Sequence, residues 1–114
     1  KASKSERNKG CEELPIKSAG GLQGKADGSL GGEPVTAHNN HPTVKPIALM
    51  EYLIKMVTPK GGIVLDPFAG SGSTLVAAKQ NGFKYIGIEL TPEYIPIIKA
   101  RLNGIDRQQS LLAD

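Results

Sequence analysis

Hydrophobic residues in the second half of the chain follow first a helical and then a strand pattern. Between Pro46 and Val57, the apolar positions 47, 50, 53, 54 and 57 fall on one face of a helix, and proline suits a first helical position. Residues 58–62 then break the chain with one proline and two glycines. Residues 63–65 (Ile-Val-Leu) form a continuous apolar run, which is typical of a strand covered on both faces.

The same alternation is repeated further along the chain. Residues 73–80 predict a helix in which the small Ala77 and Ala78 allow close packing. The Asn-Gly pair that follows is a suitable end for this helix. Residues 85–88 (Tyr-Ile-Gly-Ile) predict a second short strand, which ends at Glu89.

A last helix is predicted after this strand. Thr91 can cap it, and Pro92 suits its first position. Its expected buried stripe consists of Tyr94, Ile97, Ile98, Leu102 and Ile105. Pro96 lies about one turn into this helix and is expected to fray or bend its start. Residues 107–114 are expected to form a loose tail.

The order helix–strand–helix–strand–helix is typical of the α/β class. A parallel sheet usually has several strands with both faces covered, so two strands are too few for a complete sheet. We therefore expect residues 41–106 to form part of a doubly wound, Rossmann-like fold.

Residues 1–40 differ from the rest of the chain. They contain seven of the 14 glycines, and their few apolar residues follow neither a helical nor a strand period. A segment of this kind buries too little apolar surface to offset its chain entropy. We expect an irregular, Gly-rich linker here.

Composition and charge exclude several classes of protein. The formal net charge of +3 is too small to indicate nucleic-acid binding by itself, and aromatic residues make up only 4%. Cys11 is the only cysteine, which excludes an intramolecular disulfide and a four-cysteine zinc site. His38 and His41 lack the acidic or sulfur neighbours of a metal site, so we expect no metal. No apolar run approaches the ~18 residues of a membrane-spanning helix, so we expect a cytoplasmic protein with no membrane contact.

The turn between the first strand and its helix carries the candidate chemistry. Residues 66–74 (Asp-Pro-Phe-Ala-Gly-Ser-Gly-Ser-Thr) lie where open α/β sheets bind ligands. A phosphate-binding loop would need a lysine after the glycines, and a dinucleotide fingerprint would need glycine at position 75, which is leucine. Asp66 would repel a pyrophosphate but suits a cationic ligand, and Glu89 can accept hydrogen bonds from a ribose. S-adenosylmethionine, a phosphate-free sulfonium nucleoside, fits these residues best.

Three motifs in this order resemble those of one enzyme family. Residues 66–74 closely resemble motif I of the DNA amino-methyltransferases, which form N6-methyladenine or N4-methylcytosine. Residues 41–46 (His-Pro-Thr-Val-Lys-Pro) look like motif X, which precedes motif I in the permuted (beta) class, and residues 87–89 (Gly-Ile-Glu) are similar to motif II. Residues 1–8 also resemble a segment upstream of motif X in phage and bacterial members.

The resemblance implies a binding site for S-adenosylmethionine that is built from four sets of residues. The methionine and adenosine pocket would be lined by Asp66, Phe68, Gly70 and Gly72. The amino-acid end would find backbone or hydroxyl donors on Ser71, Ser73 and Thr74. The methionine carboxylate, an anion suited to lysine and to helix-start amides, would be enclosed by Thr43, Lys45 and Pro46. The ribose would be held by Glu89.

The family's catalytic element is absent from this sequence. It is a tetrapeptide, Asp/Asn/Ser-Pro-Pro-Tyr/Phe/Trp, which binds the target amine and stacks on the flipped base. In the permuted class it precedes motif X, and the chain begins at Lys1 rather than at a methionine. We therefore expect the tetrapeptide to lie upstream of this piece, with no catalytic residue in the chain and no DNA methylation by the chain alone.

The sequence thus predicts the cofactor-binding half of a site-specific DNA methyltransferase from a bacterial or phage-infected cell. Residues 1–40 would link it to the target-recognition and catalytic half, and DNA would be bound through the full-length enzyme. Two alternatives are a stand-alone cofactor-binding module that completes a partner chain, and a non-binding remnant that forms a homo-oligomer through its unpaired sheet edge. Solvent exposure, rather than a DNA track, is expected for Lys60, Lys84, Lys99, Arg101 and Arg107.

Overall fold

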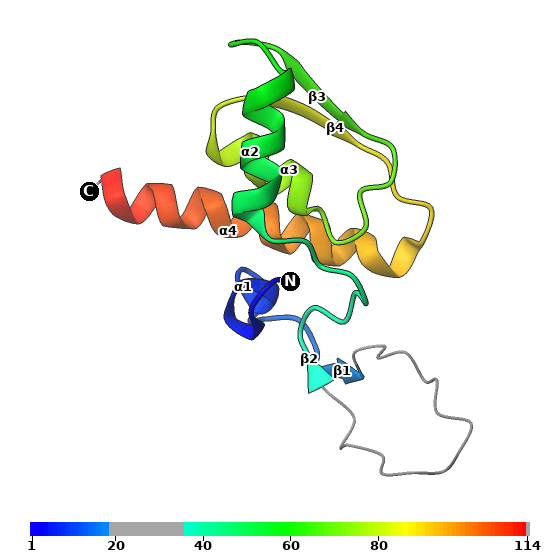
Figure 1. The fold of residues 1–114 in the computed structure, drawn as a ribbon. Helices are drawn as coiled ribbons and strands as arrows, with labels where there is room; N and C mark the ends of the chain where they lie inside the picture. Colours follow the sequence, from blue (N-terminus) through cyan, green and yellow to red (C-terminus); the bar gives the residue numbers. More distant parts are fainter. Residues whose placement is uncertain (19–35, 114) are drawn as a thin grey trace.

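The computed structural model describes residues 1–18 and 36–113, and its body is a β–α–β unit (Figure 1). Strands β3 (Ile63–Asp66) and β4 (Lys84–Gly87) lie parallel, and helix α3 (Ser73–Gln80) connects them. Helix α2 (Ile47–Val57) precedes the unit. These bounds agree with the predicted strands and helices to within one residue at each end.

The core lies on one face of this sheet. Ala77 and Ala78 are fully buried, and their small side chains let α3 pack closely against Val64 of β3 and Ile54 of α2. The predicted apolar face of α2 is only partly buried, because Val57 in its last turn is 75% exposed. A second cluster, which ties the last helix to the body, consists of Ala69, Leu75 and Ile98.

The opposite face of the sheet is uncovered in the described part of the chain. Ile63 and Leu65 are each 60% exposed, and Ile86 is 53% exposed. Successive strand residues point to opposite faces, so these side chains point away from the buried Val64. The expectation that the first strand is covered on both faces is therefore not met by the described residues of this chain. The expected shortage of sheet is confirmed, and the unit corresponds to part of a Rossmann-like α/β fold.

The last helix is longer than the sequence indicated. A 3₁₀ turn η1 (Pro92–Tyr94) leads into α4 (Ile95–Ala113), so Pro96 lies near the helix start, where N–H groups lack intrahelical partners anyway. Residues 107–113 continue α4, where we expected a loose tail. They contain neither proline nor glycine to end the helix. Position 114 lies outside the described residues.

The described parts of residues 1–40 contain more structure than an irregular linker. Helix α1 (Lys4–Asn8) is capped by Ser3, whose Oγ accepts a hydrogen bond from the Glu6 N–H at 3.1 Å. Strands β1 (Lys17–Ser18) and β2 (Thr36–Ala37) form a short antiparallel pair. The remainder of the predicted linker, residues 19–35, lies outside the described residues.

Candidate functional site

The carboxyl ends of the two parallel strands and the loop after β3 form one edge. The Asp66 carbonyl accepts a hydrogen bond from the Ile88 N–H, and the Ala69 N–H donates to the Ile88 carbonyl, both at 2.9 Å. The Asp66 side chain turns back on its own loop, where Oδ1 accepts the Phe68 N–H at 3.0 Å. The loop is therefore tied to both strands, and a carboxylate is held at the strand end.

Two glycines give this loop its shape. Gly70 has a φ of +58°, and a Cβ there would lie 2.9 Å from Nε2 of His41. Gly72 has a φ of +83° and precedes α3, and a Cβ there would lie 3.1 Å from Cγ2 of Ile98. A residue with a Cβ would suffer backbone strain at both positions, together with steric overlap at Gly70 and a tight contact at Gly72.

A small hollow of about 100 Å³ lies beside the loop. Most of the predicted cofactor residues line it, namely Thr43, Lys45, Asp66, Phe68, Gly70, Ser71, Ser73 and Thr74. His41 and Ala69 complete the lining. Pockets that enclose a drug-sized ligand measure roughly 300–1,000 Å³, so this hollow forms only one wall of such a site.

Three of the predicted cofactor residues do not line the hollow. Pro46 precedes α2 as its N-cap, and Gly72 packs against the last helix. Glu89 follows β4 at the same edge of the sheet, but its Oε1 accepts the Thr91 N–H at 3.2 Å and so caps the turn before η1.

His41 joins the predicted motif X to the loop. Its Nδ1 accepts the Thr43 N–H at 3.2 Å, and its ring meets that of Tyr94 edge-on, with 4.5 Å between ring centroids. Because Nδ1 accepts a hydrogen bond, the neutral ring carries its proton on Nε2, the atom that faces Gly70. These contacts give His41 a structural role in the turn at Pro42.

The stability of the fold should depend on the charge of His41. Burial lowers the pKa of His41 from its ordinary 6.5, the Glu89 carboxylate raises it in part, and the cations Lys45, Arg7 and Arg101 lower it further. The unfolded chain therefore takes up the proton first, so the contribution of neutral His41 is complete above about pH 6.5 and is lost as the pH falls towards the folded pKa.

We therefore expect the melting temperature to fall between about pH 7.5 and pH 5, and to fall less in His41→Gln. Circular-dichroism melts of both proteins across this range would measure the difference. An unchanged pH profile in His41→Gln would contradict the prediction.

Polar side chains of the N-terminal segment (residues 1–8) hydrogen-bond to and around the segment that resembles motif X (residues 41–46), and so form a brace that holds it in place. Glu6 Oε1 accepts the Ile47 N–H at 2.7 Å and so caps α2, whose own N-cap is a proline. Arg7 Nη1 donates to the His41 carbonyl at 2.8 Å, and Asn8 Oδ1 accepts the Asn39 N–H at 3.2 Å. Sequence reasoning missed these roles, although the resemblance of residues 1–8 to a family segment was the available signal.

Asn39 is the centre of this brace and is fully buried. Its Nδ2 donates to the Arg7 carbonyl at 3.0 Å, and its Oδ1 accepts the His41 N–H at 3.1 Å. One side chain thus bridges the end of α1 and the turn that leads into the candidate site.

Arg101 of α4 is the other residue whose role sequence reasoning missed. It was expected to be solvated, but only 4% of it is exposed. Its Nη1 donates to the Ser71 carbonyl at 2.9 Å, to Ser71 Oγ at 3.0 Å and to Ser73 Oγ at 3.1 Å. Burial lowers the pKa of Arg101, but a guanidinium stays charged in proteins.

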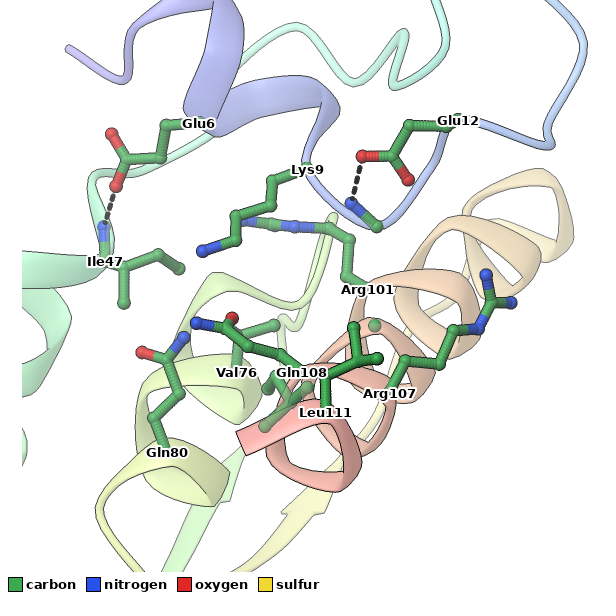
Figure 2. A pocket seen from close by; sticks show the side chains of 13 residues that line it. Glu6, Lys9, Glu12, Ile47, Val76, Gln80, Arg101, Arg107, Gln108 and Leu111 are labelled. Atoms are coloured by element: carbon green, nitrogen blue, oxygen red, sulfur yellow. Dashed lines mark hydrogen bonds between the residues drawn. The ribbon is translucent and has the colours of Figure 1, made fainter. Parts of the chain in front are cut away.

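A larger cleft of about 590 Å³ lies between the N-terminal segment and helices α3 and α4 (Figure 2). Its polar rim includes Glu6 and Glu12, whose carboxylates accept the N–H groups of Ile47 and Gly10, and backbone hydrogen bonds lower the pKa of Glu12. No residue of the loop at 66–74 lines this cleft. The cleft is larger than the hollow, but it lies away from the strand ends, where open α/β sheets bind ligands. We therefore do not assign the ligand site to it.

Other chemistries find little support in the described parts of the chain, residues 1–18 and 36–113. They contain no group of three His, Cys, Asp or Glu side chains that could hold a metal ion. In the same residues, no helix is both long and apolar enough to span a membrane. Burial raises the pKa of Cys11 to about 11, so its thiol stays protonated and unreactive near neutral pH.

Comparison with known proteins gives related sequences that match part of this chain. The DNA adenine methyltransferase YhdJ of Escherichia coli (strain K12) is 48% identical over 66 residues, which cover 58% of this chain and 22% of that protein. The type II methyltransferase M2.DpnII of Streptococcus pneumoniae is 47% identical over 64 residues, 56% of this chain and 24% of that protein. The chain spans about a fifth to a third of the length of such curated relatives.

Solved structures extend the similarity to the fold. The M1.HpyAVI–SAM complex matches with a TM-score of 0.53 and 51% identity over 55% of this chain and 31% of that one. The cytosine-N4-specific PvuII DNA methyltransferase matches with a TM-score of 0.51 and 36% identity over 54% and 22%. The family model for DNA methylases of the N6/N4 type matches residues 3–100. This chain therefore belongs to the N6/N4 DNA methylase family.

Proposed function

We propose that this chain binds S-adenosylmethionine at the carboxyl edge of β3 and β4, as the cofactor-binding part of a DNA methyltransferase. The observation that carries the proposal is the convergence of Asp66, Lys45 and the serines of the loop on one hollow beside the strand ends. The related M1.HpyAVI structure, 51% identical over the matched region, is a SAM complex, which supports this choice of ligand.

Charges at this edge suit the different parts of that ligand. The Asp66 carboxylate would attract the sulfonium and ammonium groups, while Lys45 and the first amides of α3 would bind the carboxylate. Phe68 is 88% exposed and offers an apolar surface to the nucleoside. When bound, S-adenosylmethionine supplies an electrophilic methyl group, and these residues would orient it without proton transfer.

We further propose that the methyl acceptor is the exocyclic amine of adenine (N6) or cytosine (N4). The relatives include a DNA adenine methyltransferase and a cytosine-N4-specific enzyme, which supports this pair of acceptors. Since the sequence lacks the amine-binding tetrapeptide, another segment or chain would carry the target-recognition and catalytic half. DNA would be bound through that assembly, in the cytoplasm of a bacterial or phage-infected cell.

The chain alone should bind the cofactor weakly. The hollow of about 100 Å³ is too small to enclose a nucleoside, and Leu90 beside the strand ends is 93% exposed. An open site leaves much of the apolar ligand surface in water, so little hydrophobic free energy is gained on binding. The catalytic half would supply the missing wall.

The test is a titration of the isotope-labelled chain with S-adenosylmethionine, followed by amide chemical shifts. We expect shifts in the loop at 70–74, and Asp66→Asn should weaken binding about tenfold, because it removes a charge beside a cationic ligand without changing the side-chain shape. Glu93→Gln, which removes an exposed carboxylate from η1, is the matched control. Loop shifts that ADP causes and S-adenosylmethionine does not would overturn the proposal in favour of a phosphate ligand.

A further inference from the structure

Arg101 is a buried cation that forms no salt bridge in the described part of the chain. Only 4% of it is exposed, and no carboxylate oxygen among residues 1–18 and 36–113 forms a salt bridge with it. Its Nη1 is instead directed at the glycine-rich loop, where it donates to Ser71 and Ser73 at 2.9 to 3.1 Å. A buried charge is costly, and the Glu6 carboxylate stabilises the Arg101 cation without a direct salt bridge, so the position of Arg101 against the loop calls for a functional explanation.

The chemistry of the guanidinium decides how the two serines can bond. A guanidinium only donates hydrogen bonds, so Ser71 Oγ and Ser73 Oγ both act as acceptors towards Arg101. Each hydroxyl keeps its own hydrogen for a different partner. Both serines line the small hollow, and their hydroxyls are thereby set to donate to an acceptor bound there.

The charge of Arg101 acts in the same direction as these hydroxyls. A ligand atom bonded to either serine would lie at most about 6 Å from Nη1, because two hydrogen bonds of about 3 Å each meet at an angle on the hydroxyl oxygen. Because the guanidinium is buried, solvent screens it poorly over that distance. An anionic ligand group is therefore favoured at this end of the hollow.

We propose that Arg101 is a positioning residue that makes this end of the hollow selective for a carboxylate, through Ser71 and Ser73. The inference rests on the proposed function, in which the carboxylate is that of the amino-acid tail of S-adenosylmethionine. Binding of the adenosine end of the ligand does not depend on Arg101 or on these two serines. Arg101 therefore affects one part of the ligand and leaves the other unchanged.

The experiment compares two ligands and two charge-removing variants of the full chain. S-adenosylmethionine carries the carboxylate, whereas 5′-methylthioadenosine has the same adenosine but no amino acid. Arg101→Gln should weaken binding of S-adenosylmethionine at least about tenfold and binding of 5′-methylthioadenosine less than about twofold. Lys99→Gln removes an exposed charge from the same helix and should leave both affinities within about twofold.

Each other outcome counts against the inference. If Arg101→Gln weakened the binding of both ligands equally, Arg101 would have only a structural role. If it changed neither affinity, Arg101 would have no role in binding. If Arg101→Gln does not fold, Ser73→Ala replaces it: the guanidinium keeps its bonds to Ser71, and the same selective loss is expected.

The proposed function can fail separately. If the parent chain binds neither ligand, the cofactor assignment is overturned together with the carboxylate selectivity. The positioning of the loop is then judged by amide hydrogen exchange at Ser73 and Thr74. Exchange there must be faster in Arg101→Gln than in Lys99→Gln, and equal rates would overturn the positioning as well.

Discussion

Gly70→Ala is expected to lower the free energy of unfolding by about 3 kcal/mol and to remove detectable cofactor binding. The φ of +58° costs a residue with a Cβ about 1–2 kcal/mol. The new methyl group would also lie 2.9 Å from His41 Nε2, and overpacking of this kind costs about 1–3 kcal/mol. Relief of the overlap requires His41 or the loop to move, and both line the hollow. Urea unfolding and the titration described above measure the two effects.

Gly82→Ala is the matched control for this substitution. Gly82 has a φ of +77°, but nothing lies within 4 Å of the added Cβ, so only the backbone strain of about 1–2 kcal/mol is expected. The difference between the two variants isolates the contact with His41. Equal losses of stability would mean that this contact does not constrain the loop.

Asn39→Ala is expected to lower the free energy of unfolding by about 4 kcal/mol. The side chain is fully buried, and its removal leaves the Arg7 carbonyl and the His41 N–H without partners. Each unsatisfied buried group costs about 1–3 kcal/mol. Denaturant unfolding with constant slope would measure the loss.

Asn103→Ala provides the reference, because Asn103 is exposed on α4 and its replacement should change stability by no more than about 0.5 kcal/mol. If Asn39→Ala were equally mild, the brace between α1 and the turn at His41 would contribute little. A large loss would show that the N-terminal segment is an integral part of the fold.

Local sequence patterns were sufficient to predict the helices and strands between residues 46 and 88. The period of apolar residues, the breaks at glycine and proline, and the small alanines of α3 all operate within one element, so sequence reveals them. The glycine-rich turn was recognisable for the same reason, since its residues are consecutive. Most of the predicted cofactor residues gather at one hollow because strand ends and motif order dictate their arrangement.

The parts that sequence reasoning missed depend on contacts between distant residues. Arg101 bonds to residues 28 and 30 positions away, and Glu6 caps a helix 41 positions away. Charged side chains on a helix usually face solvent, and Arg101 was placed there for that reason. Its helical spacing from Ile97, Ile98 and Ile105 of the predicted buried stripe was the local signal that separates it from the exposed Lys99. The exposed face of the sheet was missed for a similar reason. An apolar run predicts a strand, but it does not show whether another element packs against each of its side chains.

Sequence alone determined the α/β class, the order of elements from α2 to α4, the family motifs and the loop where a ligand would bind, because each depends on neighbouring residues. Tertiary structure alone decided that α1 supports the motif X match, that Arg101 lies behind the loop and that Glu89 caps a turn. It also decided that one face of the sheet is uncovered among residues 1–18 and 36–113. The physical reason is that burial and hydrogen-bond partners are properties of packed elements, and packing brings together residues that are far apart in the chain.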